Sequence, residues 1–240
     1  MGKWKQVQQY ANCISSPLEN FLKNKEKATG ILLLDATFTK VGGEDRAILI
    51  AYDTGIGVVD YWIDVTENKT AYNYVLQRLE EAGYKLICVV SDGHFSILPI
   101  IKERNLPHQR CLFHLLKELK RKFVKYDFSN LTGRNRILYS RIKWIFKTKK
   151  IEDLPGRIKF FREKTEPIFQ DKQTILDWFW RVLPSAILHL SYNENIPRTT
   201  GLLENLNGQI KARLKTFRGV KSEMSLNNLL KILFYFRKYK

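Results

Sequence analysis

The sequence predicts an α/β fold in which a mixed β-sheet precedes a long, all-helical segment. Three segments rich in β-branched and aromatic residues, at residues 31–40, 46–54 and 57–65, are joined by the turn sequences GGED and TGIG, which is typical of an antiparallel meander. The continuous apolar run KLICVV follows a helix-like segment, and such a strand is typically parallel and central in its sheet. From residue 112 the pattern becomes nearly all helical.

The periodicity of apolar residues places the elements in chain order. A helical lead-in covers residues 3–27, where Trp4, Val7, Tyr10 and Ile14 follow at three- and four-residue steps. After the meander, a helix over residues 68–82 ends at Gly83 and leads into the apolar strand over residues 85–90. Helices fill residues 112–190, and two last helices are predicted over residues 200–217 and 225–238.

This order divides the chain into four parts. Residues 1–27 are the lead-in, residues 28–111 the first part of the core, residues 112–196 an α-helical insertion, and residues 197–240 the helices that complete the core. Seven aromatic residues are expected to form the hydrophobic core of the insertion. They are Trp144, Phe146, Phe160, Phe161, Trp178, Phe179 and Trp180.

The charge of the chain is unevenly distributed along it. The formal net charge is +17, and the isoelectric point is about 9.8. Residues 1–110 contain 13 Lys and Arg against 13 Asp and Glu, so the 28 basic and 11 acidic residues of the second half supply the whole excess. A lopsided basic chain of this kind indicates a polyanionic partner such as nucleic acid. No strongly amphipathic cationic helix stands out, which argues against a membrane surface.

No apolar run approaches the roughly 20 residues that are needed to span a bilayer, and the first thirty residues are charged, unlike a signal peptide. Cys13, Cys88 and Cys111 make an odd number of cysteines, which argues against a secreted disulfide framework. We therefore expect a cytoplasmic protein with reduced thiols and no membrane partner.

Asp35 stands in the middle of the strand-like run ILLLDATFTK. Aspartate is depleted in strands and is almost never fully buried without a partner, so something must compensate for this charge. Two interpretations are open, a hydrogen-bonded core aspartate and an acid of a functional site.

Two further acids are candidates for the same site. Asp92 follows the apolar strand, and α/β folds tend to bind ligands at the C-terminal ends of parallel strands. Asp92 could equally close a turn or cap a helix that begins near Phe95. Glu204 lies early in a late helix, on a face that also carries Asn207, Gly208, Lys211 and Lys215, whereas Leu202, Leu203, Leu206, Ile210, Leu214 and Phe217 form the apolar stripe. Glycine inside a helix costs about 1 kcal/mol relative to alanine, so a ligand is expected to approach the backbone near Gly208.

Acids that converge repel one another unless a cation lies between them. Hard oxygen ligands favour Mg²⁺ or Mn²⁺. Two such ions roughly 4 Å apart can activate an attacking hydroxyl and stabilise the leaving oxygen of a phosphodiester. Convergence of Asp35, Asp92 and Glu204 on metal ions, with a basic half to hold a polyanion, therefore points to phosphoryl transfer.

The order and spacing of these motifs resemble a known family. Asp92 follows Asp35 after 57 residues, QRCLFH comes about twenty residues later, and PRTTGLLENLNGQIKARLKTFRGVKS contains Glu204, 112 residues after Asp92. This set resembles the catalytic domain of the Mutator-like bacterial insertion-sequence transposases over about residues 28–235. That family belongs to the DDE class and has a ribonuclease H-like fold.

The resemblance implies that Asp35, Asp92 and Glu204 are the DDE triad and bind two Mg²⁺ ions, for which Mn²⁺ can substitute. It implies a DNA transposase that acts on element ends and target DNA as a homodimer or higher oligomer, in the cytoplasm on the nucleoid. Water first attacks the phosphodiester at each element end, and the freed 3′-OH then attacks the target. The insertion would lie between the second aspartate and the glutamate.

The family also carries a Cys-x-x-His signature, which Cys111 and His114 match here. A structural zinc ion needs four ligands, and the remaining Cys and His residues offer no second closely spaced pair, so a structural or DNA-adjacent role is expected. Arg110 is expected to meet phosphate. The expected DNA-facing row comprises Lys211, Arg213, Lys215, Arg218 and Lys221.

Two departures from the family pattern leave alternatives open. Gly201 stands where family members often have asparagine, so a polar contact near the metal would be missing or supplied by Thr200 or Asn205. The lead-in is also too short for the usual N-terminal module that recognises element ends, so the chain is expected to be a catalytic core or a shortened product, or to borrow its specificity. A ribonuclease H-like nuclease without strand joining and a catalytically silent DNA-binding relative are the rival functions.

Three other acids lie in the meander. Asp53 ends the second strand, and Asp60 and Asp64 lie on the third. For each of them we expect a place at a solvated edge or in a turn rather than in catalysis.

Overall fold

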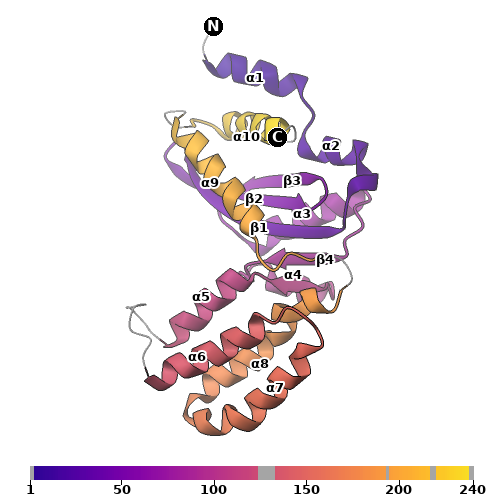
Figure 1. The fold of residues 1–240 in the computed structure, drawn as a ribbon. Helices are drawn as coiled ribbons and strands as arrows, with labels where there is room; N and C mark the ends of the chain where they lie inside the picture. Colours follow the sequence, from indigo (N-terminus) through magenta and orange to yellow (C-terminus); the bar gives the residue numbers. More distant parts are fainter. Residues whose placement is uncertain (1–2, 124–132, 193–194, 217–219, 238–240) are drawn as a thin grey trace. The chain divides into compact units, whose positions relative to one another are not determined.

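The computed structural model describes residues 3–123, 133–192, 195–216 and 220–237. The chain forms two compact units (Figure 1). The first consists of residues 1–107 and 200–240, and the second of residues 108–199. The first unit is therefore discontinuous in sequence.

The sheet of the first unit combines an antiparallel meander with a parallel strand. Its strands are β1 (Ile31–Val41), β2 (Glu44–Asp53), β3 (Gly57–Asp64) and β4 (Cys88–Ser91), in the order β3-β2-β1-β4. β1 pairs antiparallel with β2 and parallel with β4, as predicted for a ribonuclease H-like core. Gly42 and Gly43 join β1 to β2 with φ of 60° and 95°, the positive values that a two-residue hairpin turn of this type requires.

Helices cover both faces of this sheet. The helices of the first unit are α1 (Lys3–Cys13), α2 (Pro17–Lys23), α3 (Lys69–Glu81), α4 (Leu98–Glu103), α9 (Gly201–Thr216) and α10 (Glu223–Arg237), with a short 3₁₀ turn at Lys25–Lys27, and α1 packs on α10. The predicted lead-in is broken in two, because Ser16 and Glu19 form a capping box and Pro17 begins a new helix. Asn68 caps α3 by accepting the Ala71 N–H at 2.8 Å.

Successive side chains of β1 lie on opposite faces of the sheet, as in any β-strand. Leu32 and Leu34 pack with Val75 and Leu76 of α3 in one hydrophobic cluster. Leu33 and Asp35 belong to the other side of the strand, where α9 contacts β1 (Figure 1). The sheet therefore presents Asp35 to α9 and its apolar neighbours to α3.

Asp53 is fully buried, so the expected solvated position is wrong, although the turn role is correct. Its carboxylate accepts hydrogen bonds from the backbone of Thr29, Gly30, Gly55 and Ile56, and Tyr84 donates its hydroxyl at 2.7 Å. A buried carboxylate needs such partners, and here they join the start of β1 to the end of β2.

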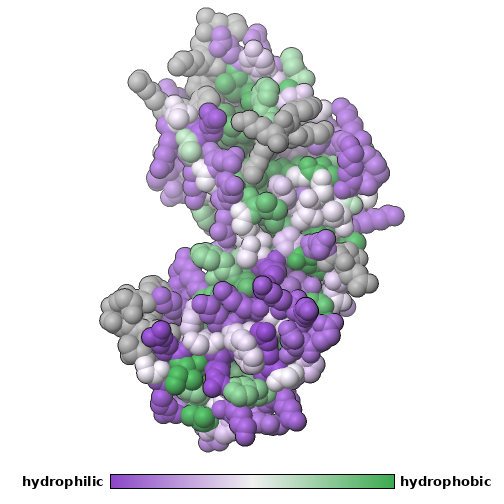
Figure 2. Space-filling view, in the orientation of Figure 1, coloured by the Kyte–Doolittle hydropathy of each residue, from purple (hydrophilic) through white to green (hydrophobic). Residues whose placement is uncertain are grey.

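The second unit is helical apart from one short strand. It contains β5 (His108–Arg110), α5 (Leu112–Phe123), α6 (Gly133–Phe146), α7 (Asp153–Lys164) and α8 (Gln173–Ile187), with 3₁₀ turns at Glu166–Lys172 and Leu188–Leu190. Phe146, Phe161, Trp178 and Phe179 lie in its core, as expected. Trp144 and Phe160 are instead 42% and 38% exposed, which corrects their placement in the core. Hydrophilic side chains otherwise predominate on the visible face of this unit (Figure 2).

Within the described residues, every helix is too short or too polar to cross a bilayer.

Asp60 is also buried, with a relative exposure of 2%, which corrects its expected solvated position. Arg78 lies 3.4 Å from its Oδ1 atom. Burial raises the pKa of Asp60 to about 6, and the positive charge of Arg78 opposes this shift only in part.

We predict that Asp60 makes the protein less stable as pH rises from 4 to 6. Over this interval the unfolded carboxyl has ionised whereas the folded one still holds its proton, so folding takes up a proton and rising pH favours unfolding. The contribution is about 3 kcal/mol, and it levels off above pH 6. Urea unfolding of the wild type and of Asp60→Asn at pH 4 and pH 6.5 measures it.

The difference in unfolding free energy between the two proteins should change across this interval. Asp45→Asn is the control, because Asp45 is an exposed acid whose side chain is 75% accessible. A constant difference between the wild type and Asp60→Asn would contradict the prediction.

Candidate active site

Asp35 and Asp92 lie at the same level of two adjacent parallel strands. The last residue pair of the β1–β4 ladder is Leu34 with Ser91, and the two aspartates are the next residues along each strand. Neighbouring strands are about 4.8 Å apart, so the backbones of the two residues lie at about that spacing. Both residues are half-buried. The pairing of the strands thus brings together two of the three predicted acids.

Glu204 approaches the same place from α9. Asn207, one helical turn after Glu204, donates from Nδ2 to Asp35 Oδ2 at 2.8 Å. Side chains three residues apart share one face of a helix, with Cβ atoms about 5–6 Å apart. The contact between Asn207 and Asp35 therefore directs the face of α9 that also carries Glu204 toward β1.

Thr200 fixes the side chain of Glu204. Its Oγ1 atom donates to Glu204 Oε1 at 3.3 Å, and the Glu204 N–H donates to the Thr200 carbonyl at 2.9 Å. Thr200 is fully buried, whereas Glu204 is exposed. Of the two residues expected to compensate for Gly201, it is Thr200 that contacts the glutamate.

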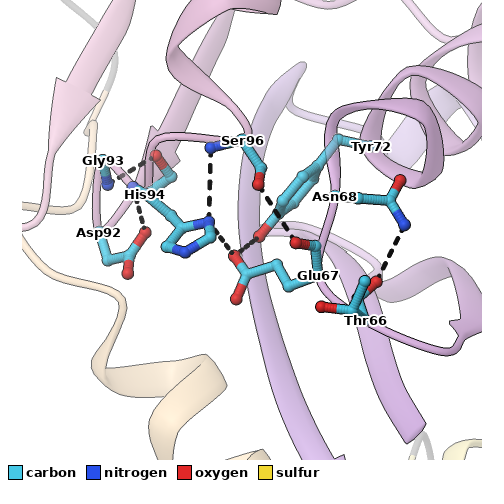
Figure 3. Close-up of polar contacts among 9 residues, drawn as sticks. Thr66, Glu67, Asn68, Tyr72, Asp92, Gly93, His94 and Ser96 are labelled. Atoms are coloured by element: carbon cyan, nitrogen blue, oxygen red, sulfur yellow. Dashed lines mark hydrogen bonds and ion pairs between the residues drawn. The ribbon is translucent and has the colours of Figure 1, made fainter.

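Asp92 closes a tight turn after β4 (Figure 3). Its Oδ1 atom accepts the His94 N–H at 2.8 Å, and Ser91 Oγ accepts the Gly93 N–H at 3.1 Å. Gly93 has a φ of +81°, which glycine adopts without strain. The turn interpretation is thus correct for one carboxylate oxygen of Asp92. The capping interpretation is wrong, because α4 begins at Leu98 with Ile97 as its N-cap residue.

Glu67, Tyr72 and His94 extend the polar site, and no spacing pattern in the sequence predicts that they belong to it. Tyr72 donates its hydroxyl to Glu67 Oε1 at 2.7 Å, and His94 Nδ1 lies 3.0 Å from the same oxygen (Figure 3). Burial raises the pKa of Glu67, and the negative charge of Asp92 raises it further, against the influence of Tyr72 and His94. The position of Glu67 just before the N-cap residue of α3 was a weak signal, because acids are common there.

The pKa of Tyr72 shows that these acids share one neighbourhood. Burial raises it well above its usual value, and the charges of Glu67, Asp92 and Asp35 raise it further. Asp35 and Asp92 therefore both lie near the Tyr72 hydroxyl, together with Glu67.

The available ligand atoms suit a hard divalent cation. Asp35, Asp92 and Glu204 offer carboxylate oxygens, and Asn207 Oδ1 is buried without a hydrogen-bond partner among the described residues. Oxygen ligands of this kind favour Mg²⁺ or Mn²⁺. The donor set thus fits the predicted metal.

The predicted DNA-facing residues of α9 lie in solvent. Lys211, Arg213 and Lys215 are exposed, as is Lys221 beyond the helix, whereas Arg218 falls outside the described residues. A Cβ atom built on Gly208 would meet nothing within 4 Å. The protein itself therefore leaves open space at Gly208.

The signature residues lie in the second unit. Cys111 is buried and His114 is half-buried at the start of α5. Arg110 Nη2 lies 3.0 Å from Glu118 Oε2, and its side chain is only 11% exposed. The expected phosphate contact of Arg110 would thus compete with this ion pair.

Comparison with known proteins identifies relatives over most of the chain. A family model described as "Transposase, Mutator family" matches residues 15–239. The transposase for insertion sequence element IS905 of Lactococcus lactis subsp. lactis (strain IL1403) is 25% identical over 185 residues, covering 74% of this chain and 44% of the relative. The transposase for IS256 in transposon Tn4001 of Staphylococcus aureus is 23% identical over 239 residues, covering 89% and 57%. The chain thus spans about half the length of the curated relatives it matches.

Among solved structures, the HTLV-2 integrase catalytic core domain in complex with magnesium (dimeric form) covers 48% of this chain and 83% of its own. The sequence identity is 18% and the TM-score is 0.30.

We predict that Asn207→Ala lowers the free energy of unfolding by about 1–2 kcal/mol in metal-free buffer at pH 7. The variant removes a hydrogen bond to a charged group, and such bonds contribute about 1.5–3 kcal/mol, whereas loss of the unpartnered Oδ1 offsets part of the effect. Urea denaturation measures the change. Asn205→Ala on the exposed side of α9 is the control, and equal effects of the two variants would contradict the predicted role of Asn207.

Proposed function

Because the chain belongs to the Mutator family of transposases, we propose that it cuts DNA at the ends of a mobile element and joins the freed 3′ ends to target DNA. The observation that supports this proposal is the hydrogen bond from Asn207 of α9 to Asp35, one residue beyond the strand pair that precedes Asp92. A chain that only bound DNA would gain nothing from acids gathered beside a basic surface.

Asp35, Asp92 and Glu204 would hold two Mg²⁺ ions, for which Mn²⁺ would substitute. Bound there, the ions would activate an attacking hydroxyl and stabilise the leaving oxygen of a phosphodiester. Asn207 and Thr200 keep two of the carboxylates in place through the hydrogen bonds described above. Lys211, Arg213, Lys215 and Lys221 would bind the phosphate backbone, and Gly208 would let it approach α9.

Joining two element ends to one target requires two active sites, which favours a homodimer or higher oligomer on DNA.

A basic groove in the second unit offers a further DNA contact. Its volume is about 510 Å³, and its lining includes Lys143, Lys147, Lys149, Lys150 and Arg157, with Asp153 as its one acid. The exposed Trp144 ring lies in the same groove, with the Arg157 guanidinium 4.6 Å from its centre. Like charges gathered in this way repel one another, and a phosphate backbone would relieve that repulsion.

We predict that Asp35→Asn, Asp92→Asn and Glu204→Gln each abolish strand nicking and strand joining. The substitutions keep the shape of each side chain and remove the charge that a cation needs. Plasmid nicking and joining of a pre-cut 3′-OH end measure the two steps, and circular dichroism and metal-free DNA binding should stay unchanged. Asp45→Asn, on the exposed end of β2, is the control.

Retained activity in one of these variants would remove that residue from the triad. Nicking without joining in the wild type would instead favour a nuclease, and the absence of divalent-cation binding by calorimetry would favour a silent DNA-binding relative.

We predict that the triple variant Lys147→Glu, Lys149→Glu and Lys150→Glu weakens DNA binding and reduces the slope of log K against log salt by about 2–3. Each phosphate contact contributes about 0.9 to that slope through counterion release. Fluorescence anisotropy with a labelled duplex at several salt concentrations measures it. The control triple variant Lys159→Glu, Lys164→Glu and Arg181→Glu changes the net charge equally at other exposed positions of the same unit. Equal losses in both would exclude a specific groove.

A further inference from the structure

Glu67 is a largely buried acid that the three-carboxylate site does not require. It lies in the loop between β3 and α3, and its side chain is 12% exposed. Removing a carboxylate from water is costly unless hydrogen bonds compensate, and Asp92 adds a second negative charge nearby. The presence of the Glu67 carboxylate at this position, despite its desolvation cost, therefore indicates a structural or functional role.

Two side chains converge on one oxygen of Glu67. Tyr72 donates its hydroxyl to Oε1 at 2.7 Å, and His94 Nδ1 lies 3.0 Å from that atom (Figure 3). A carboxylate only accepts, so Nδ1 carries the proton and donates. The Ser96 N–H also lies close to Nδ1, at 3.4 Å, but a protonated Nδ1 cannot accept a hydrogen bond. We therefore assign the Nδ1 proton to the shorter contact, the one with Glu67.

These contacts lead directly to Asp92. The backbone N–H of His94 donates to Asp92 Oδ1 at 2.8 Å, so His94 links Glu67 to the turn that orients this carboxylate. Ser96 Oγ donates to the Glu67 carbonyl at 3.2 Å and ties the far end of the same turn to the same residue. Tyr72, which is 2% exposed in the core of the first unit, anchors Glu67 to α3.

We propose that Glu67 is a positioning residue for Asp92. Through Tyr72 and His94 it holds residues 92–96 in the one conformation in which Asp92 Oδ1 accepts the His94 N–H, and this conformation orients the Asp92 carboxylate toward a divalent cation. This role rests on the proposed function of Asp92 as a metal ligand. Glu67 itself acts through His94 and does not bind the cation.

The test compares substitutions that separate hydrogen bonding from charge. Glu67→Gln keeps an oxygen that can accept from both Tyr72 and His94, whereas Glu67→Ala removes it. Glu81→Ala is the control, because Glu81 is an exposed acid at the end of α3. Urea denaturation and circular dichroism check that each variant is folded, and Tyr72→Phe provides a milder change that removes only one of the two donors.

Calorimetric titration with Mn²⁺, without DNA, gives the first measurement. Loss of a residue that orients a metal ligand typically costs 10–100-fold in affinity. We expect Glu67→Ala to weaken Mn²⁺ binding at least about tenfold. Glu67→Gln should change it less than about threefold, with an unchanged number of ions bound. If Glu67→Gln loses as much affinity as Glu67→Ala, or loses one bound ion, Glu67 is a direct ligand and the proposal is overturned.

Amide hydrogen exchange in metal-free protein gives the second measurement, and it does not depend on activity. Residues 92–97 should exchange faster in Glu67→Ala and in Tyr72→Phe than in the wild type or in Glu81→Ala. Adding His94→Ala to Glu67→Ala should weaken Mn²⁺ binding no further, because the two residues act in one chain of contacts. Unchanged exchange, or additive losses of affinity, would contradict the proposal.

The two hypotheses fail in different ways. If Asp92→Asn binds Mn²⁺ as tightly as the wild type, the proposed function of Asp92 is wrong, whatever Glu67 does. If Asp92→Asn loses binding whereas Glu67→Ala keeps it, only the positioning role of Glu67 is wrong.

Discussion

The parallel pairing of β1 with β4 is the constraint on which the site depends. It puts Asp35 and Asp92 one residue beyond a matched pair, at the spacing of neighbouring strands. Two charges about 5 Å apart repel by about 3 kcal/mol at an effective dielectric constant of 20. A hydrogen bond to a charged group contributes about 1.5–3 kcal/mol, so the bond that Asn207 donates to Asp35 offsets at most about this one repulsion. The addition of Glu204 leaves an excess of negative charge that a cation would balance.

Polar contacts, some of them between distant parts of the chain, orient the acids. Asn207 reaches Asp35 from 172 residues away, and Thr200 contacts Glu204 within one turn of its own helix. Near Asp92, Tyr72 donates a hydrogen bond to Glu67, and Glu67 contacts His94 in the turn that contains Asp92. Directional bonds of this kind define one orientation for a carboxylate, whereas apolar contacts would allow several.

Much of the fold could be predicted because strands and helices leave periodic patterns, and Asp35 was noticeable as an acid in an apolar strand. Side-chain partners were harder to predict. Spacing places Asn207 on the polar face of its helix, although it is 7% exposed, whereas Leu202 of the predicted apolar stripe is 47% exposed. Spacing shows which residues share a face but not which distant residue that face meets. The burial of Asp53 and Asp60 is hidden from the sequence for the same reason, since their partners Tyr84 and Arg78 come from later segments. Glu67 resembles any acid at the start of a helix.

The first unit is interrupted between residues 107 and 200, so its two parts are synthesised at different times. The sheet and its two aspartates emerge first, and at about 5–20 residues per second the intervening segment delays α9 by several seconds. Until α9 docks, the side of β1 that carries Asp35 is uncovered and the third acid is absent. Under the proposed function, a nascent chain therefore lacks its third metal-binding acid until synthesis of the core is nearly finished.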